Sequence, residues 1–373
     1  MSRNGRVLVA MSGGVDSSVA AAMLHEEGYE VIGMTMKTWD YVSSGSRSKE
    51  TGCCSLDSIN DARNVAVSMG FPHYVIDIRQ EFGDYVINHF VEEYLAGRTP
   101  NPCVLCNTHI KWEALLKRAD KLDCEYIATG HYAQRAVSGT RYYIKKGVDA
   151  HKDQSYVLWG LSQKSLARTL FPIGKYHKSE IKKMALEMGF KDLFKKSESY
   201  EICFVPDNDY REFLKFKVPG LAEKVEGGNF VLTDGTVVGK HKGYPFYTIG
   251  QRRGLEIALG YPVYVVDIIP QTNTVVLGKD EALLSTEMWV KEINLMKYES
   301  ISQGMSAHTK IRYRDEGTDS CLYMEHGQVK VVFNEPVRAV TPGQSAVFYE
   351  NEDLIGGGWI TKNAPSVESS QVS

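Results

Sequence analysis

The chain has 373 residues, 43% of them hydrophobic, which is enough for two or three domains with substantial cores. No apolar run approaches the roughly 20 residues of a membrane-spanning helix, and no apolar signal segment follows the first residues, so we expect a cytoplasmic protein. The formal net charge of -3 does not exclude a nucleic acid, because binding needs a local basic patch rather than a basic total.

A short apolar run at 7–11 predicts the first strand, and it leads into Ser-Gly-Gly-Val-Asp-Ser-Ser at 12–18 and an apolar-periodic helix. Gly13 and Gly14 permit a tight turn and close approach to an anion, and hydroxyls follow where a helix N-terminus offers N–H groups. This pattern predicts a phosphate cradle. Without a following Gly-Lys-Ser/Thr it is not a Walker A loop, and it resembles the PP-loop of ATP pyrophosphatases. Asp16 is a candidate helix cap, but near a triphosphate we expect it to help hold Mg²⁺.

Strands and helices alternate over residues 1–130. Strands are predicted at 29–37, 74–78 and 126–129, and helices at 56–69, 82–95 and 110–122. This alternation predicts an α/β fold with a parallel sheet, whose ligand sits at the carboxyl ends of the strands. Both the loop at 12–18 and Gly130-His131 follow such strand ends.

The cysteines form the next pattern. Seven cysteines without a signal peptide favour thiol chemistry or metal binding over structural disulfides. Cys103 and Cys106 form a Cys-x-x-Cys in a proline-opened turn, and Cys203 follows far downstream. A Cys-x-x-Cys at a turn or helix start can have a lowered thiol pKa, and the thiolate is the reactive form. The alternatives for this pattern are a redox dithiol, an iron–sulfur site and a zinc site. Zinc is disfavoured because a structural site wants four ligands and the adjacent Cys53 and Cys54 serve one metal poorly. Cys124 and Cys321 are predicted to be packing residues.

Beyond about residue 210, turn residues separate short β-rich runs. Predicted strands at 264–268, 307–313, 320–324, 329–333 and 345–349 indicate a small β-barrel near the C-terminus. The segment 241–247 with Arg252-Arg253 interleaves cations and aromatic residues, which suits RNA, although an ordinary hairpin with core aromatic residues fits equally. We predict a catalytic domain at 1–209, a central RNA-binding domain at 210–283, a barrel at 284–362 and a disordered tail at 363–373.

Taken in order, eight segments resemble tRNA-specific 2-thiouridylases of the MnmA family. They are Met11–Ser18, Gly52–Ser55, Gly97–Asn107, Ala128–Tyr132, Lys152–Tyr156, Tyr247–Arg252, Lys310–Tyr313 and Thr341–Gln344. The resemblance runs from about residue 6 to 360 and implies a PP-loop (adenine nucleotide alpha hydrolase-like) domain, a small central domain and a C-terminal β-barrel. It implies ATP-dependent 2-thiolation of the wobble uridine of tRNA. In that reaction uracil O2 is adenylated, sulfur is transferred to C2, and AMP and pyrophosphate are released.

The resemblance also implies roles for individual residues. ATP contacts fall on Ala10, Met11, Ser12, Gly13, Gly14, Val15, Asp16, Ser17, Met36 and Gly130. The target base lies against Asn101, Pro102 and Cys103, with Cys106 as nucleophile and Cys203 as the persulfide carrier. tRNA contacts fall on His131, Lys152, Asp153, Gln154, Arg312, Tyr313 and Gln344. The implied cofactors are ATP and Mg²⁺, and the implied partners are tRNA and a sulfur-donor protein or sulfide.

Cys103 departs from the best-known family pattern, which has Asp three residues before the nucleophile. Two mechanisms remain open. In one, Cys106 and Cys203 form a transient disulfide and Cys103 lines the base pocket. In the other, Cys103, Cys106 and Cys203 hold a [4Fe–4S] cluster.

Two other function classes are also open. One is a small-molecule PP-loop ligase of the argininosuccinate-synthetase or amidotransferase type, which needs neither Cys106 nor Cys203. The other is a non-catalytic tRNA-binding protein, against which the intact loop argues.

Overall fold

The structure is a computed structural model that describes residues 3–39, 55–194, 202–205, 208–362 and 364. The chain forms two compact units. The first comprises Met1–Ile87, Pro102–Tyr210 and Glu352–Leu354, and the second Asn88–Asn101, Arg211–Asn351 and Ile355–Ser373. None of the described helices is both long and apolar enough to cross a membrane.

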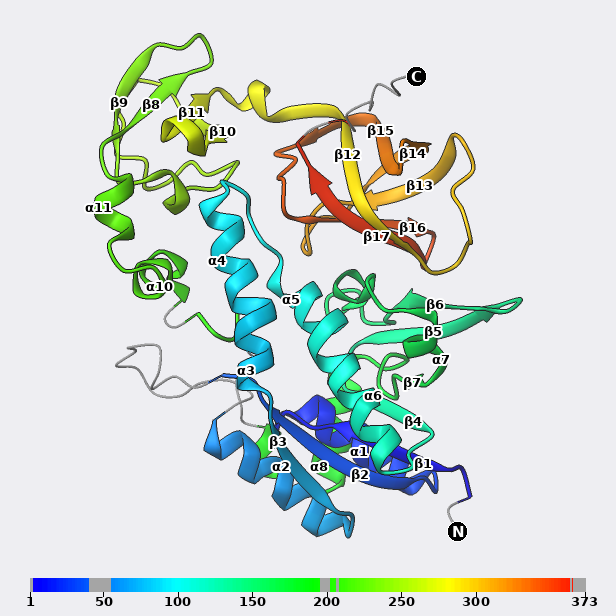
Figure 1. Ribbon diagram of the computed structural model, residues 1–373. Helices are drawn as coiled ribbons and strands as arrows, with labels where there is room; N and C mark the ends of the chain where they lie inside the picture. Colours follow the sequence, from blue (N-terminus) through cyan, green and yellow to red (C-terminus); the bar gives the residue numbers. More distant parts are fainter. Residues whose placement is uncertain (1–2, 40–54, 195–201, 206–207, 363, 365–373) are drawn as a thin grey trace, which may run out of the picture. The chain divides into compact units, whose positions relative to one another are not determined.

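A five-stranded parallel sheet forms the centre of the first unit, with strand order β3-β2-β1-β4-β7 (Figure 1). Its strands are β1 (Arg6–Ala10), β2 (Glu30–Lys37), β3 (His73–Asp77), β4 (Tyr126–Thr129) and β7 (Thr169–Leu170). Because β1 pairs with β2 on one side and with β4 on the other, the strand order reverses at β1. The carboxyl ends of β1 and β4 therefore flank the switch point, where α/β sheets bind ligands.

Helices α1 (Val15–Glu26), α2 (Leu56–Met69), α6 (Trp112–Lys121) and α8 (Lys178–Glu187) accompany this sheet. The middle of α1 is the fully buried run Ala20-Ala21-Ala22, whose small side chains let neighbouring elements approach closely. One core joins α1 with β1 and β2 and with Ile181 and Ala185 of α8. Because α1 and α8 pack against each other in this core, their positions in the first unit are fixed relative to one another.

The remaining elements of the first unit connect these parts. They are α3 (Arg79–Phe82), the π-helical segments η2 (Gly83–Ile87) and η3 (Cys106–Lys111), α5 (Pro102–Leu105), the hairpin β5 (Ala133–Ser138) and β6 (Arg141–Lys146), η4 (Ser155–Leu158), α7 (Gln163–Ala167) and α9 (Lys191–Phe194). Asp353, at the start of β17 (Asp353–Thr361), pairs with Lys145 of β6.

The second unit contains a four-stranded sheet and a barrel. The strands of the sheet lie in the order β10-β11-β8-β9. They are β8 (Gly228–Leu232), β9 (Val237–His241), β10 (Tyr264–Ile269) and β11 (Thr274–Gly278). The helices of this part of the unit are α4 (Asn88–Leu95), α10 (Tyr210–Lys217) and α11 (Leu221–Val225). The barrel runs β12-β15-β14-β13-β16-β17 and closes through pairing of β12 with β17. Its strands are β12 (Leu284–Leu295), β13 (Met305–Lys310), β14 (Thr318–Glu325), β15 (Gln328–Arg338), β16 (Ser345–Glu350) and β17.

This architecture confirms the predicted α/β fold with a parallel-sheet domain, a central domain and a C-terminal barrel. One predicted helix is different: the span 82–95 divides into the end of α3, the π-helical η2 and α4. Gly83, which lies at that division, disfavours a continuous helix. Cys53, Cys54 and nearly all of the predicted tail lie outside the described residues.

Candidate active site

The turn between β1 and α1 is shaped by one glycine. Gly13 has φ +72°, and a Cβ on it would lie 1.9 Å from the carbonyl oxygen of Ser58 in α2. Only glycine therefore fits, both for the backbone conformation and for the contact. Gly14, the residue before α1, has ordinary extended dihedrals, and a Cβ on it would lie 3.5 Å from Ser12 Oγ, an ordinary contact. A side chain would fit there, but its absence keeps the turn between Ser12 and α1 open to a ligand.

Backbone amides and hydroxyl groups gather at the start of α1. The first hydrogen bond of the helix runs from Ser18 N to Gly14 O (3.2 Å). The amides of residues 15–17 come before it, at the end of the helix where N–H groups have no acceptor within the helix. Ser17 Oγ accepts from Ser12 N at 3.1 Å and lies 3.2 Å from Ser12 Oγ. This arrangement offers several donors and the positive helix end to one anion.

Gly130 brings the other strand end to the same place. A Cβ on Gly130 would lie 2.7 Å from Ser17 N and 2.9 Å from Asp16 C, so β4 abuts the first turn of α1. On the β2 side, Thr35 Oγ1 donates to Met11 O at 2.8 Å, which ties the residue before Met36 to the turn. The residues predicted to bind ATP thus meet at the switch point of the sheet.

Asp16 has partners that the sequence did not reveal. Lys178 Nζ donates to both carboxylate oxygens of Asp16 at 2.7 Å, and Tyr132 OH donates to Asp16 Oδ1 at 2.8 Å. Lys178, the first residue of α8, is only 9% exposed. A cation at a helix N-terminus opposes the helix dipole, and that placement is the sequence signal that would have singled out this lysine.

The Cys-x-x-Cys spans two helical segments, with Cys103 in α5 and Cys106 at the first position of η3. Cys103 is exposed, whereas Cys106 is 8% exposed. Burial of its surroundings raises the pKa of the Cys103 thiol, and the Lys111 ammonium partly offsets this. At neutral pH Cys103 is accordingly a thiol rather than a thiolate.

Neighbouring segments fix η3 in place. Asn107 is buried, and its Nδ2 donates to Val157 O of η4 at 3.0 Å. η4 in turn follows the predicted tRNA-contacting residues 152–154 directly in the chain. π-Helical segments recur at functional sites, so this feature agrees with the predicted role of Cys106.

Cys203 lies in a turn that is anchored by its neighbour Phe204, which is 1% exposed. The centroid of the Phe204 ring lies 5.6 Å from that of Phe82 in α3 and 6.4 Å from that of Trp39, which follows β2. Because α3 also contacts η3, the turn of Cys203 and the helix of Cys106 share a neighbour.

The described residues gather no group of three or more His, Cys, Asp or Glu side chains suited to a metal ion. Cys103, Cys106 and Cys203 all belong to this described part, and they are not assembled as a ligand set. The donor arrangement therefore does not fit a [4Fe–4S] cluster and gives that alternative no support.

Three residues of the first unit that are predicted to contact tRNA have side chains with polar partners within the protein. His131 Nδ1 lies 2.9 Å from Thr129 Oγ1, and burial, with a smaller effect of Lys111, lowers the His131 pKa to about 3. Asp153 accepts from Gly147 N and Ser155 N. In Gln154, Oε1 accepts from Tyr132 N at 3.0 Å. Asp153 and Gln154 thus shape the loop that presents Lys152.

In the second unit, Gln344 forms hydrogen bonds with the segment that precedes the Cys-x-x-Cys. Its Nε2 donates to Thr99 O at 3.1 Å and to Pro100 O at 2.9 Å, and Thr99 N donates to Pro342 O at 3.0 Å. Gln344 therefore positions the segment leading to Asn101. Arg312 and Tyr313, by contrast, are exposed after β13.

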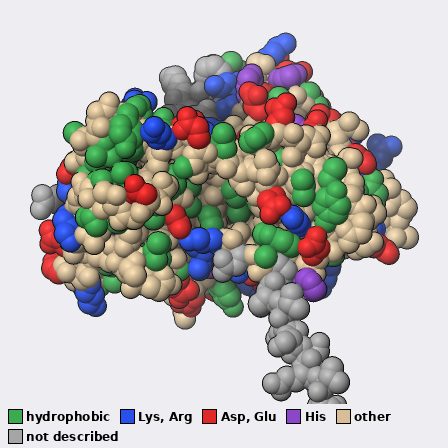
Figure 2. Space-filling model, turned by 90° about the horizontal axis from the view of Figure 1, so that it is seen from above, with side chains coloured by type: hydrophobic (Ala, Val, Ile, Leu, Met, Phe, Trp, Pro, Cys, Tyr) green, Lys and Arg blue, Asp and Glu red, His purple; other side chains and the backbone are tan. Residues whose placement is uncertain are grey.

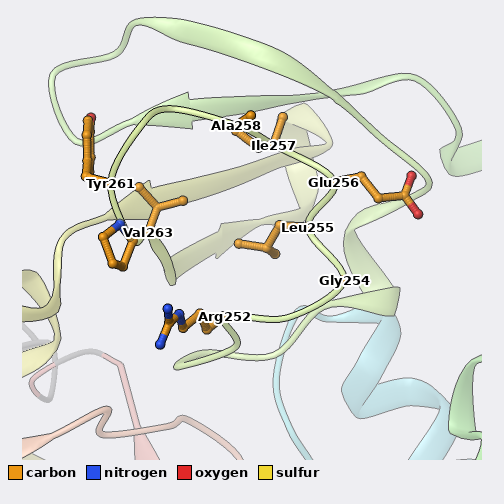
Figure 3. A pocket seen from close by; sticks show the side chains of 9 residues that line it. Arg252, Gly254, Leu255, Glu256, Ile257, Ala258, Tyr261 and Val263 are labelled. Atoms are coloured by element: carbon orange, nitrogen blue, oxygen red, sulfur yellow. The ribbon is translucent and has the colours of Figure 1, made fainter.

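The basic-aromatic segment of the central domain separates into core and surface. His241 and Tyr247 pack their rings against Phe230, as in an ordinary hairpin core, and Phe246 is also buried. Arg252 is exposed and lines a pocket of about 340 Å³ together with residues 254–258 and 261–263 (Figure 3). The exposed Tyr261 ring shares this pocket, so a cation and an aromatic surface occur together there.

On the face shown in Figure 2, acidic and basic side chains are interspersed over the described residues. No single-sign field covers that face. An RNA partner bound there would depend on a few local cations.

Comparison with known proteins identifies the family. The family model for the tRNA methyl transferase HUP domain matches residues 5–207, that for the tRNA methyl transferase PRC-barrel domain 213–279, and that for the aminomethyltransferase beta-barrel domain 285–360. A protein of Cytophaga hutchinsonii called tRNA-specific 2-thiouridylase MnmA is 66% identical over 362 residues, 96% of this chain and 98% of that protein. Proteins with the same name from Amoebophilus asiaticus and Salinibacter ruber are 63% and 61% identical; each match covers 96% of this chain, and 96% and 95% of those proteins.

The chain belongs to the tRNA-specific 2-thiouridylase family. Membership at this identity and coverage decides against a small-molecule ligase. In this member of the family the three matched domains follow one another in the order predicted from sequence.

Proposed function

We propose that this chain is a tRNA-uridine 2-sulfurtransferase that uses ATP to convert the wobble uridine, U34, to 2-thiouridine. The observation that carries the proposal is the amide and hydroxyl cradle at the switch point, in a chain 66% identical to a protein called tRNA-specific 2-thiouridylase. A cradle of this kind serves phosphate groups, and the relatives' name supplies the substrate class.

The first step activates a poor electrophile. Uracil O2 attacks the α-phosphorus of ATP, pyrophosphate departs, and N3 releases its proton, so that C2 carries an AMP leaving group. The amides at the start of α1, together with Ser12 and Ser17, stabilise the charge that develops on the phosphates. Ala10, Met36 and Gly130 form the strand-end walls around the nucleotide in this proposal.

The second step transfers sulfur. A persulfide-bearing donor protein passes its outer sulfur to Cys203, and that sulfur then attacks C2 and displaces AMP together with the original O2. Cys106 loses its proton to solvent, and its thiolate attacks Cys203 Sγ, which breaks the bond between Cys203 Sγ and the transferred sulfur. N3 then takes up a proton from solvent, which leaves a thiocarbonyl at C2. The two cysteines become a disulfide while the transferred sulfur is reduced, and a thiol reductant restores them.

Cys103 takes a passive part in this scheme. Its raised pKa keeps it a neutral thiol, so it lines the base pocket with Asn101 and Pro102 and does not act as an acid or base. His131, Lys152, Arg312 and Tyr313 are proposed to contact tRNA directly, and Asp153, Gln154 and Gln344 to support the contacting segments. A cytoplasmic location belongs to the same proposal.

The test combines nucleoside analysis with pyrophosphate release. With ATP, Mg²⁺, a protein persulfide donor and an unmodified tRNA bearing U34, we expect 2-thiouridine and tRNA-dependent pyrophosphate. Cys106→Ser and Cys203→Ser should each abolish 2-thiouridine but keep pyrophosphate release, because adenylation precedes the use of either thiol. Cys321→Ser, in barrel strand β14, is the matched control and should behave as wild type. Thiolation without ATP, or by Cys106→Ser, would overturn the proposal.

A further inference from the structure

Two helix N-termini and one ammonium group converge beside the phosphate cradle. α1 begins at Val15 and α8 at Lys178, the two helices pack against each other, and Lys178 Nζ reaches Asp16 in the first turn of α1. Each helix start carries roughly half a positive charge, so Lys178 adds a full charge where the field is already positive. Only a compensating anion explains an almost buried lysine at this position.

The anions already present are committed to holding these elements. Asp16 binds Lys178 through both oxygens, and Asp149 accepts from Lys178 N at 2.9 Å and from His151 N at 3.1 Å. Lys178 is thereby fixed at its backbone by one carboxylate and at its ammonium group by the other. Its side chain is 11% exposed, so the ammonium has little freedom to move elsewhere.

This arrangement does not fit Asp16 as a magnesium ligand built into the protein. Mg²⁺ bound to a carboxylate oxygen lies about 2.1 Å from it, which would put the ion next to an ammonium group already in contact with both oxygens. The described residues offer no cluster of further acidic side chains to share such an ion. The expected Mg²⁺ role of Asp16 thus disagrees with its donor set.

We propose that Lys178 is a phosphate-binding residue of the ATP site and that Asp16 is its positioning residue, not a ligand of Mg²⁺. Asp16, which itself accepts from Tyr132 OH, holds the ammonium at the first turn of α1, where it binds the phosphates of ATP. Mg²⁺ enters with ATP, on the phosphate oxygens. The inference rests on the proposed function only in that ATP occupies this cradle.

The experiment measures ATP affinity by calorimetry with the full chain in the absence of tRNA. Lys178→Met keeps the aliphatic stem and removes the charge, so the packing of α8 is retained. We expect its ATP dissociation constant to rise about 10- to 100-fold, with AMP affected less than threefold, because AMP lacks the β and γ phosphates. Lys178→Arg should recover part of the loss. Lys183→Met, on the same helix and with a side chain that is 78% exposed, is the matched control and should bind ATP as wild type does.

Asp16→Asn separates a positioning role from metal ligation. If Asp16 positions Lys178, the variant weakens ATP binding but leaves the Mg²⁺ concentration for half-maximal ATP binding within about twofold, and adding Lys178→Met causes little further loss. A tenfold rise in that Mg²⁺ concentration for Asp16→Asn, with none for Lys178→Met, would overturn the proposal, as would a Lys178→Met protein that binds ATP normally. A wild-type chain that binds no ATP would instead contradict the proposed function.

Discussion

At the scale of single residues, two opposing effects set the pKa of Cys103, the first thiol of the Cys-x-x-Cys. Desolvation by the surrounding protein raises the pKa of Cys103, and the Lys111 ammonium lowers it. An exposed thiol with a raised pKa is accessible but poorly nucleophilic, because the thiolate is the reactive form. This combination suits a residue that contacts a base without attacking it.

Alkylation of Cys103 should therefore be slow at pH 7 and accelerate with pH. Below the thiol pKa the thiolate fraction grows about tenfold per pH unit, so the rate should still be rising past pH 9, the ordinary range of a cysteine. Lys111→Met should slow the reaction further at every pH, since it removes the charge that lowers the pKa. Peptide mass spectrometry after timed iodoacetamide treatment measures this site alone.

Lys117→Met is the control for that experiment. Lys117 lies on α6, its side chain is 71% exposed, and its neighbour is Glu113. It should leave the rate at Cys103 unchanged. A rate that is flat between pH 7 and 9 would mean that Cys103 is already a thiolate, and the passive role assigned to it would be wrong.

At the scale of elements, the nucleotide site depends on how closely β4 meets α1. Gly130 lies against Ser17 N and Asp16 C, both of them backbone atoms that cannot rotate away. Any side chain there must move the strand end or the helix start. The same helix start carries the amide donors of the cradle, so the effect reaches ligand binding.

Gly130→Ala should cost about 1 to 3 kcal/mol of the free energy of unfolding and weaken ATP binding, because the added methyl overpacks a backbone contact. Urea unfolding and calorimetry measure the two effects. Gly83→Ala is the matched control: it lies in a helical segment, and nothing is within 4 Å of the place its methyl group would take, so it should leave both quantities unchanged or slightly improve stability. An alanine at 130 that binds ATP normally would show that this contact does not define the site.

The same scale shows what the sequence could and could not predict. Hydrophobic periodicity located α2 and β4 with their observed bounds, because both are bordered by clear turn residues. It missed β7, whose two residues carry no period, and the β5–β6 hairpin within a polar stretch. Gly13 and Gly14 pointed to the cradle because glycine permits a tight turn and the close approach of an anion to the backbone. Lys178 was missed because no helix was predicted at 178–187, so its place at a helix N-terminus did not show, and because its partner Asp16 lies 162 residues away.

At the scale of the whole molecule, a net charge of -3 must coexist with binding to a polyanion. Interspersed charges on the face in Figure 2 agree with recognition by a few placed cations rather than by a broad field. Proposed contacts occur in both units, with Lys152 in the first and Arg312 in the second. Both belong to loops that hydrogen bonds hold in shape: Lys152 N donates to Asp149 O, and Arg312 Nη2 donates to Arg338 O.

Binding of tRNA should accordingly weaken steeply with salt, and each lost phosphate contact should reduce the slope of log affinity against log salt by about 0.7 to 0.9. Lys152→Ala and Arg312→Ala should each do so, and the double variant should show the sum if each residue contacts its own phosphate, since the two residues belong to separate units. Fluorescence anisotropy with labelled tRNA at several salt concentrations measures these slopes. Lys183→Ala, an exposed cation of α8, removes the same charge and should leave the slope as in wild type. The three single variants each remove one positive charge. An equal change in their three slopes would therefore mean that overall charge governs binding, and the assignment of local contacts would fail.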